Sequence, residues 1–383
     1  MEEPKNTIRE NKQGRMKIKK TYKIIGLMSG TSLDGLDIAY CTFSYTRNRW
    51  HYKVAAAETI PYSHQWKNKL QNLETKSALE FALTDTQYGH LIGKETRDFI
   101  KKYKITPDFI ASHGHTIFHQ PGKGQKTQGG KGMTTQIGNG AAIAAESGFP
   151  VICDFRTGDV ARGGQGAPLV PIGDSLLFAD YKSCINLGGF ANISYNKKGL
   201  RQAYDICPVN IVLNDLSQKL GRTYDTKGSL ARIGLVNDKL LAQLNGLPYY
   251  KQKPPKSLGK EWVKKAILPL LKNSKSNPHD LLRTFTEHAA IQISKALQST
   301  TTSFLQAHSS SLFSGGGTYN SFLVERIRFH SPVSIFTPDR KTIEFKEALI
   351  FSFLGLLRWT NQINCLSSVT GAKADSAGGC IYL

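Results

Sequence analysis

The stretch that most constrains the fold is a turn rich in glycine and hydroxyl groups, residues 26–37, which read Gly-Leu-Met-Ser-Gly-Thr-Ser-Leu-Asp-Gly-Leu-Asp. It lies between two strand-like runs, residues 22–25 and 38–43. Two strands joined in this way predict a hairpin whose tip exposes backbone N–H groups and hydroxyls, the donors that bind a nucleotide phosphate. An ordinary tight turn uses the same residue types, so this turn alone leaves both interpretations open.

Two further glycine-rich turns occur later in the chain. They are residues 186–192, Asn-Leu-Gly-Gly-Phe-Ala-Asn, and residues 314–320, Ser-Gly-Gly-Gly-Thr-Tyr-Asn. Three such turns favour a nucleotide held between two lobes, and a length of 383 residues corresponds to roughly two or three domains. The P-loop, dinucleotide-binding and protein-kinase signatures are missing, so we expect hairpin tips to hold any nucleotide.

The composition argues against a membrane protein and against a secreted one. No apolar run approaches the ~20 residues that cross a bilayer, and the N-terminus has no apolar core of the kind that a secretory signal requires. The six cysteines form no C-x-x-C pair and mostly lie in apolar runs. We therefore expect reduced core cysteines in a cytoplasmic protein.

The net charge of +21 raises the question of nucleic-acid binding. Residues 1–20 carry seven basic and three acidic side chains, and residues 251–275 carry eight lysines with Glu261 as the only acid. No aromatic stacking platform is interleaved with these lysines, and no nucleic-acid-binding motif is apparent. We expect a solvated basic face that attracts anionic substrates, and no nucleic-acid or membrane partner.

Strand-like and helix-like segments alternate along the chain, which indicates an α/β fold. Residues 77–80, Ser-Ala-Leu-Glu, form a capping box that predicts a helix toward Tyr103. After a second hairpin over residues 183–195, we expect a helix that begins at Pro208 and ends at Gly221. Further helices are expected, among others, over residues 139–147, 281–305 and 344–362. The predicted domains are a disordered basic tail (1–20), a first lobe (21–155 and 345–383) and a second lobe (156–344).

A series of motifs resembles that of the anhydro-N-acetylmuramic acid kinase family, in the family's order and from about Tyr22 to the end of the chain. The motifs are MSGTSLDG (28–35), SHGHT (112–116), QIGN (136–139), DFR (154–156), DVA (159–161), GGQGAPLVP (163–171), NLGGFAN (186–192), PKS (255–257) and SGGG (314–317). The resemblance implies a two-lobed, actin-like (ribonuclease H-like) sugar-kinase fold with an interdomain ATP cleft. It also implies ATP and Mg²⁺ as cofactors, a small-molecule sugar substrate and a cytoplasmic role in recycling cell-wall sugar, and it leaves a homodimer open.

The resemblance implies a coupled reaction. Members of this family hydrolyse the anhydro bridge of the sugar and phosphorylate the freed hydroxyl. A carboxylate takes the proton of the attacking water, while the γ-phosphoryl of ATP accepts the departing oxygen. The position of the family's base matches Asp205, in Tyr-Asp-Ile-Cys-Pro-Val-Asn (204–210). By local pattern alone, Asp205 could instead cap the helix expected after it.

The chain departs from the family pattern at three places. Cys207 and Val209 replace glycines that follow the base, so either the loop has another conformation or the substrate pocket is reshaped. His115 stands where glutamine is usual. A neutral histidine still donates one hydrogen bond and accepts another, so a polar contact to the sugar can survive.

The remaining site residues are assigned by the resemblance. Asp34 or Asp37 is expected to hold Mg²⁺ through water, and Arg156 matches the lactyl carboxylate of the sugar in charge and geometry. Residues expected to bind the nucleotide are Gly30, Thr31, Ser32, Asp34, Gly35, Asp37, Gly188, Gly189, Asn192, Gly315, Gly316 and Gly317. Residues expected to bind the sugar are His113, His115, Arg156, Asp159 and Glu347.

Two other functions stay open at this point. In an extended segment, His113, His115 and His119 would project from one face, and three histidines suit a catalytic zinc of a hydrolase. No carboxylate obviously neighbours them to orient the rings, which counts against this alternative. The second is a non-catalytic, actin-like ATP-binding protein, which would keep the three glycine turns but would not need Asp205.

Overall fold

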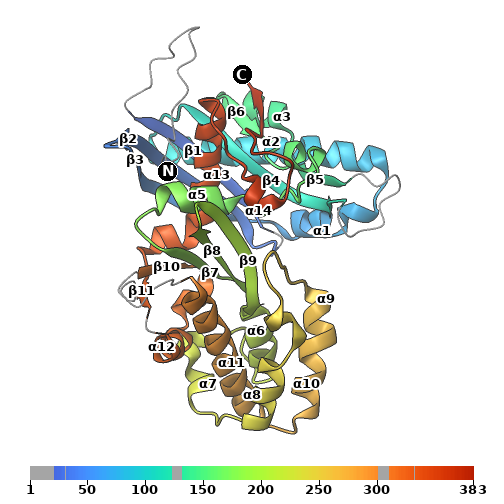
Figure 1. The fold of residues 1–383 in the computed structure, drawn as a ribbon. Helices are drawn as coiled ribbons and strands as arrows, with labels where there is room; N and C mark the ends of the chain where they lie inside the picture. The colour runs from blue at the N-terminus through green and yellow to red at the C-terminus, as the bar shows by residue number, and fades with distance from the viewer. Residues whose placement is uncertain (1–20, 31, 123–131, 301–309, 332) are drawn as a thin grey trace.

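The computed structural model describes residues 21–30, 32–122, 132–300, 310–331 and 333–383, and it contains two β-sheets with helices around each (Figure 1). The first sheet has the strand order β12-β6-β4-β1-β2-β3, with β5 paired to β4. Ser29 lies opposite Leu36 in the antiparallel β1–β2 pair, which confirms the first predicted hairpin. The strands are β1 (Tyr22–Ser29), β2 (Gly35–Thr46), β3 (Arg49–Pro61), β4 (Phe109–Gln120), β5 (Met133–Ile137), β6 (Val151–Cys153) and β12 (Cys380–Tyr382).

Helices cover both faces of the first sheet. Helices α1 (His64–Asn72), α2 (Ala78–Tyr103) and α3 (Gly140–Ser147) share one hydrophobic core with the sheet, and α5 (Val170–Leu177) and α13 (Arg340–Trp359) share another. The helix predicted from the capping box is confirmed: α2 follows Ser77, whose side chain caps it by accepting a hydrogen bond from the Glu80 N–H. Gly148, with a φ of 77°, ends α3 as expected.

Helix α13 lies very close to the first sheet. A Cβ atom on Gly26 of β1 would come within 1.9 Å of the Ala348 carbonyl oxygen, so only glycine allows this approach. The contact fixes the position of Glu347, the residue before Ala348, along the sheet. The helix begins at Arg340, four residues before the predicted start, because Asp339 caps it by accepting from the Thr342 N–H.

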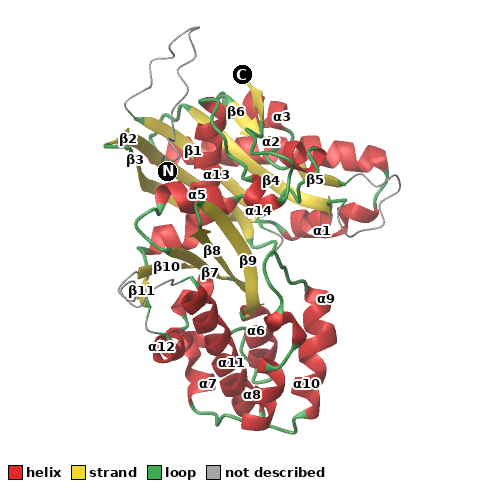
Figure 2. Ribbon diagram, viewed as in Figure 1, coloured by secondary structure: helices red, strands yellow, loops and turns green. Residues whose placement is uncertain are grey.

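The second sheet has the strand order β11-β10-β7-β8-β9. Its main core lies against α6 (Asn210–Gln218), α11 (Pro278–Ser299) and α12 (Ser321–His330), and the helices of this half gather beyond the sheet in Figure 2. The strands are β7 (Ser183–Leu187), β8 (Phe190–Lys197), β9 (Leu200–Pro208), β10 (Ser310–Ser314) and β11 (Ser334–Phe336). The other α-helices are α4 (Thr157–Ala161), α7 (Ser229–Arg232), α8 (Asp238–Asn245), α9 (Lys260–Trp262), α10 (Leu268–Asn273) and α14 (Ser367–Thr370).

Two more predicted helix starts differ from the structure. Strand β9 continues through Pro208, which lies opposite Phe190, and α6 begins only at Asn210. Proline is tolerated there because β9 is the last strand of its sheet. Helix α11 starts at Pro278, since Asn277 caps it, rather than at residue 281. The predicted end of that helix, at residue 305, lies outside the described residues.

The two sheets are joined through a shared core. Cys184 of β7 and Leu312 of β10 belong to the same hydrophobic cluster as α5, α13 and one face of the first sheet. Helix α13 is therefore in contact with both halves of the molecule. In the described ranges, no helix is both long and apolar enough to cross a membrane.

Candidate active site

The first glycine turn joins β1 to β2. Ser32 and Asp34 are exposed at its tip, where polar groups can meet a ligand. Gly35 has a packing role, because a Cβ atom there would come within 2.4 Å of the Ile60 carbonyl oxygen on β3. Gly30 has no such restriction, since the nearest atom to its Cβ would be the Ser32 hydroxyl at 3.5 Å, an ordinary contact. Thr31 lies outside the described residues.

The second and third glycine turns lie side by side. Asn186 of β7 is paired with Ser314 of β10, and Gly188 and Gly189 follow directly in the turn after β7. A Cβ atom on Gly315, whose φ is 83°, would come within 2.4 Å of Asn186 Oδ1. Gly317 is equally restricted, since its Cβ would approach the Leu187 side chain to 2.8 Å, whereas Gly316 faces open space.

Asp205 lies in a row of polar residues across the second sheet. In the strand registers, Asn186 is opposite Asn192, and Asn192 is opposite Asp205. The row begins next to the third turn at Ser314. The predicted base, the predicted nucleotide residue Asn192 and two glycine turns thus occupy one end of this sheet.

The Asp205 carboxylate does not cap α6, so the alternative of a helix cap is wrong. The cap position is Val209, which makes no side-chain capping bond. The first N–H groups of the helix region are satisfied by the second turn instead: Val209 donates to the Gly189 carbonyl at 2.8 Å, and Asn210 donates to the Gly188 carbonyl at 3.3 Å. The second turn therefore supports the helix that follows the base.

One oxygen of the Asp205 carboxylate is held and the other has no hydrogen-bond partner among the described residues. The Leu258 N–H donates to Oδ2 at 2.9 Å. Burial raises the pKa of Asp205, and the Leu258 hydrogen bond opposes this rise by stabilising the ionised form. A partly buried carboxylate with a raised pKa and one available oxygen is suited to act as a general base.

Glu344 of α13 lies between the first and third turns. The Tyr319 hydroxyl, from the third turn, donates to Glu344 Oε1 at 3.2 Å. Asp37 of β2 accepts from the Thr59 hydroxyl at 2.5 Å. Burial raises the pKa of Asp37, the Thr59 hydrogen bond lowers it, and the carboxylates of Asp34 and Glu344 raise it further. Glu344, near the start of α13, thus connects the third turn with the end of the first.

Arg156 and Glu347 are within electrostatic reach of each other. Loss of hydration raises the pKa of Glu347, whereas the Arg156 guanidinium lowers it and Asp37 raises it again. Glu347 is nevertheless exposed to solvent at its surface. Burial lowers the pKa of Arg156 to about 10, so it stays positive near neutral pH. An anionic group next to Arg156 would find a permanent positive charge.

His113 orients Arg156. The Arg156 Nε–H donates to His113 Nε2 at 2.9 Å, and His113 Nδ1 lies 2.8 Å from the Gly114 carbonyl oxygen. A carbonyl can only accept, so Nδ1 carries the proton and Nε2 is free to accept. Burial and the neighbouring Arg156 hold the pKa of His113 well below its usual range, consistent with a neutral ring.

His115 belongs to a separate hydroxyl chain. Its Nδ1 lies 2.9 Å from the Ser29 hydroxyl, which accepts from the Tyr62 hydroxyl at 2.7 Å. Tyr62 is in turn 2.5 Å from the Tyr88 hydroxyl. Burial lowers the pKa of His115 to about 4, so the ring is neutral near pH 7.

The expectation that three histidines share one face was wrong. His113 packs against Phe351 of α13, and His115 packs against Tyr88 of α2, which covers the other face of the sheet. Gly114, with a φ of 73°, breaks the alternation between them. His119 is engaged with the Thr134 hydroxyl at 3.0 Å. Within the described part of the chain, no group of three or more His, Cys, Asp or Glu side chains is placed to hold a metal ion.

Asp159 is engaged by three donors of the protein. Its Oδ1 accepts from the Thr370 hydroxyl at 2.7 Å and from the Cys365 thiol at 3.1 Å, and its Oδ2 accepts from the Gly166 N–H at 2.7 Å. The side chain is buried. In this structure Asp159 connects the loop after α4 to the C-terminal segment, and its predicted contact with the sugar stays a prediction.

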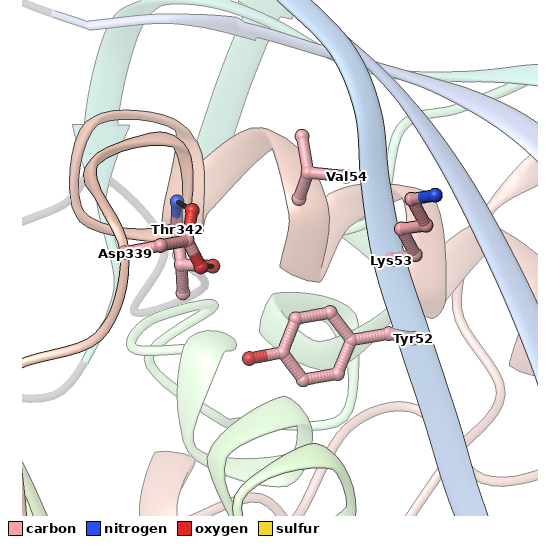
Figure 3. Close-up of a pocket in the computed structure, with 5 residues that line it drawn as sticks. All are labelled: Tyr52, Lys53, Val54, Asp339 and Thr342. Atoms are coloured by element: carbon pink, nitrogen blue, oxygen red, sulfur yellow. Dashed lines mark hydrogen bonds between the residues drawn. The ribbon is translucent and has the colours of Figure 1, made fainter.

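Two cavities lie in the first half of the molecule. One has a volume of about 350 Å³ and is lined by residues of β3 and of the start of α13 (Figure 3). These residues are Tyr52, Lys53, Val54, Asp339 and Thr342. None of them is a predicted site residue. The other, of about 150 Å³, reaches the predicted site, because His113 and Gly114 are in its wall together with Asn139. The larger of these two cavities is therefore not lined by the residues expected to do the chemistry.

The side chains that replace the family glycines point into the core of the second half. Cys207 and Val209 are both fully buried. The Cys207 thiol lies 3.9 Å from the Ala289 carbonyl oxygen of α11. Neither residue has a positive φ, so neither position needs glycine for a left-handed backbone. The substitutions fill the space behind Asp205.

The sequence reasoning missed the residues that support Asp205. Tyr249 and Leu258 contact it from about fifty positions away in the sequence, and Glu344 joins the first turn to the third. The Pro-Lys-Ser motif at residues 255–257 was the sequence signal that could have pointed to this segment, but no role was assigned to it.

The fold is α/β, with two sheets that share a core and with glycine turns at the ends of their strands. A family model of anhydro-N-acetylmuramic acid kinase matches residues 22–383. The chain belongs to the anhydro-N-acetylmuramic acid kinase family, so the family and fold class expected from the motifs are confirmed.

Several named relatives are similar over nearly their whole length. The anhydro-N-acetylmuramic acid kinase of Francisella tularensis subsp. novicida (strain U112) is 33% identical, with 91% of this chain and 96% of that protein covered. The enzyme of the same name from Microcystis aeruginosa (strain NIES-843 / IAM M-2473) is 32% identical, with 94% and 99% covered.

Solved structures are more distant. The activator of the 2-hydroxyisocaproyl-CoA dehydratase from Clostridium difficile, with bound ADPNP, has a TM-score of 0.42 and 11% identity, with 86% of this chain and 92% of that chain covered. A ROK hexokinase from Thermus thermophilus has a TM-score of 0.33 and 11% identity, with 87% and 99% covered. Both TM-scores are below 0.5, so these likenesses carry no argument about this chain.

Proposed function

We propose that the protein is an anhydro-N-acetylmuramic acid kinase of the cytoplasm. It converts 1,6-anhydro-N-acetylmuramic acid, ATP and water into N-acetylmuramic acid 6-phosphate and ADP, a step in the recycling of cell-wall sugar. The family match over residues 22–383 supports this activity. The observation that carries the mechanism is the Asp205 carboxylate, with one oxygen held by the Leu258 N–H and the other available.

Asp205 acts as the general base for the attacking water. Its available oxygen accepts a proton from water as the water oxygen forms a bond to the anomeric carbon of the sugar. The bond between that carbon and the bridging oxygen breaks, and the bridging oxygen forms a bond to the γ-phosphorus of ATP while ADP leaves. The proton ends on Asp205 and then returns to solvent.

The two halves of the site divide the nucleotide between them. The first turn offers Gly30 and Ser32, and the second offers Gly188 and Gly189. Asp34 is close enough to raise the pKa of Asp37, and the two side chains supply the carboxylate oxygens that Mg²⁺ prefers. Bound there, Mg²⁺ would neutralise charge on the phosphates.

Arg156 is the residue best placed to receive the lactyl carboxylate. It is permanently charged, partly exposed and oriented by His113. A guanidinium pairs with a carboxylate through two parallel hydrogen bonds, which fixes the orientation of the ligand as well as holding it. Glu347 lies close to Arg156 and can accept hydrogen bonds from sugar hydroxyls.

The decisive experiment is mass spectrometry of the products made from the anhydro sugar and ATP in water enriched in heavy oxygen. We expect heavy oxygen on the anomeric carbon and phosphate on the freed hydroxyl. ADP formation without a sugar phosphate would rule the proposal out. Tight ATP binding without turnover would favour a binding protein, and an ATP-independent, zinc-dependent reaction would favour a hydrolase.

A further inference from the structure

The segment of residues 249–258, here called the strap, lies along the outer edge of the second sheet. Strand β9 is the last strand of that sheet, so no strand of the described residues lies along its outer edge. The Asp205 N–H, on this edge, donates to the Lys256 carbonyl at 3.2 Å. The strap therefore takes the place of a neighbouring strand at the position of the proposed base.

Three polar groups of Asp205 are bonded to the strap. Besides the N–H, its carbonyl accepts from the Tyr249 hydroxyl at 2.5 Å, and its Oδ2 accepts from the Leu258 N–H at 2.9 Å. Both the N–H and the carbonyl of the base are therefore hydrogen-bonded, and its carboxylate is hydrogen-bonded through one oxygen. A residue bound in this way has little freedom to turn.

Lys256 and Tyr249 hold the strap together. The Lys256 ammonium lies 4.5 Å from the centre of the Tyr249 ring and 5.5 Å from that of Tyr204, the residue before Asp205. It also donates to the Tyr249 carbonyl at 3.2 Å. A cation over an aromatic face is attracted by the ring, and more strongly where water is partly excluded. The Tyr249 ring is buried and packs on Trp262 at 5.3 Å between ring centres.

We propose that Tyr249 and Lys256 are positioning residues for Asp205: they hold the strap against β9 so that the available carboxylate oxygen faces the attacking water. The inference rests on the proposed function of Asp205. Neither side chain needs to touch the substrates, because both act through the strap and the main chain of the base. Misplacement of a reacting group by about 1 Å can lower a rate by roughly 10²-fold.

The first test replaces Lys256. Lys256→Met keeps the length of the side chain but removes the charge, and we expect turnover to fall roughly 10- to 100-fold while the KM values for ATP and sugar change by less than about twofold. Lys256→Arg should restore most of the turnover, because a guanidinium also binds aromatic faces. Lys253→Met is the matched control, since Lys253 is exposed in the same strap.

The second test replaces Tyr249. Tyr249→Phe removes only the hydroxyl that donates to the Asp205 carbonyl and keeps the ring under Lys256. We expect turnover to fall roughly tenfold with KM values nearly unchanged. Thermal unfolding should show that both variants stay folded.

The third test concerns the hydrogen bond to the carboxylate. Leu258→Pro removes the N–H that stabilises ionised Asp205, so the acidic limb of the pH–turnover profile should move up by about one pH unit. Leu258→Ala keeps the N–H and should keep the limb. The other titratable groups near Asp205 are the Cys207 thiol and the phenols of Tyr204 and Tyr249, with Lys256 beside Cys207. Each of these four keeps its chemistry in both variants.

Failure of this inference can be told apart from failure of the proposed function. If Asp205→Asn is inactive but the Lys256→Met and Tyr249→Phe variants have normal turnover, the strap does not position the base and the inference is wrong. If Asp205→Asn itself turns over normally, the assignment of the base is wrong. A rise in KM alone in the strap variants would show a binding role and would also overturn the inference.

Discussion

Asp205 and Asp159 are both buried or partly buried aspartates assigned to the site by the same resemblance, yet the structure surrounds them differently. Asp159 accepts hydrogen bonds from Gly166, Cys365 and Thr370, and its side chain is buried with an exposed fraction of 1%. Asp205 accepts one hydrogen bond at its carboxylate, from the Leu258 N–H, and keeps an oxygen available.

The difference shows what a base needs. A carboxylate whose oxygens are both engaged stabilises the chain around it but has little capacity left for a proton from water. A carboxylate anchored through one oxygen is oriented and can still react. We therefore expect substitution of Asp205 to affect turnover, and substitution of Asp159 to affect stability.

The largest expected effect is that of Asp205→Asn on turnover. Asparagine keeps the shape and polarity of the side chain but cannot take a proton, so turnover should fall by roughly 10²–10⁴-fold. Binding of ATP and sugar should change little, because this interaction matters chiefly in the transition state. Steady-state kinetics, with calorimetry for binding, measure both quantities.

A second outcome would contradict the assignment of the base. Near-normal turnover in a folded Asp205→Asn protein would show that Asp205 is not the general base. Glu347, which lies near Arg156 and has a raised pKa, would then be the next candidate. Asp159 would follow only if its hydrogen bonds proved dispensable.

The pH dependence should give a smaller but graded effect. Asp205 works as a base only when it is ionised, so turnover should fall about tenfold for each pH unit below its pKa. Burial raises that pKa, and this places the acidic limb above the ordinary range of an aspartate near 3.9. A limb at or below the ordinary value would contradict the burial of this carboxylate.

Asp159→Asn should lower stability. The amide that replaces one oxygen would face at least one donor, and the mismatch should cost about 1–3 kcal/mol in the free energy of unfolding. Denaturant unfolding measures this. Asp215→Asn is the control, since Asp215 is about half exposed and should change stability by less than about 0.5 kcal/mol. Unchanged stability with a raised KM for the sugar would show instead that Asp159 contacts substrate.

Local sequence signals predicted the elements of the fold, and the resemblance assigned the base, but neither predicted how the parts meet. The two hairpins and the capping box at Ser77 depend on neighbouring residues, which a sequence displays directly. The contacts of Asp205 with the strap join residues 44 and 53 positions apart, and only the folded chain brings them together.

Errors arose where one residue changed a regular pattern. The three histidines of the SHGHT region were placed on one face by strict alternation, which the positive φ of Gly114 interrupts. Pro208 was taken as a helix start because proline favours that position, but here it ends a strand at the edge of the sheet. In both cases the local sequence pattern is overridden by the conformation that the folded structure imposes.

The smallest expected effect on activity is that of a substitution at Cys207, where the family has glycine. Cys207 is fully buried near Ala289, so Cys207→Gly should remove packing and add backbone freedom, at about 1–2 kcal/mol of stability. Turnover should stay within about threefold, because the thiol lies in the core and the backbone there has no positive φ.

Comparison with a second buried cysteine separates packing from chemistry. Cys207→Ala and Cys41→Ala both remove a thiol from a fully buried site, in the cores of different halves. We expect similar losses of stability from the two variants, with turnover per folded molecule kept in both. If Cys207→Ala alone changed turnover by more than about tenfold, the thiol would shape the position of Asp205. The support of the base would then extend from the strap to the core behind it.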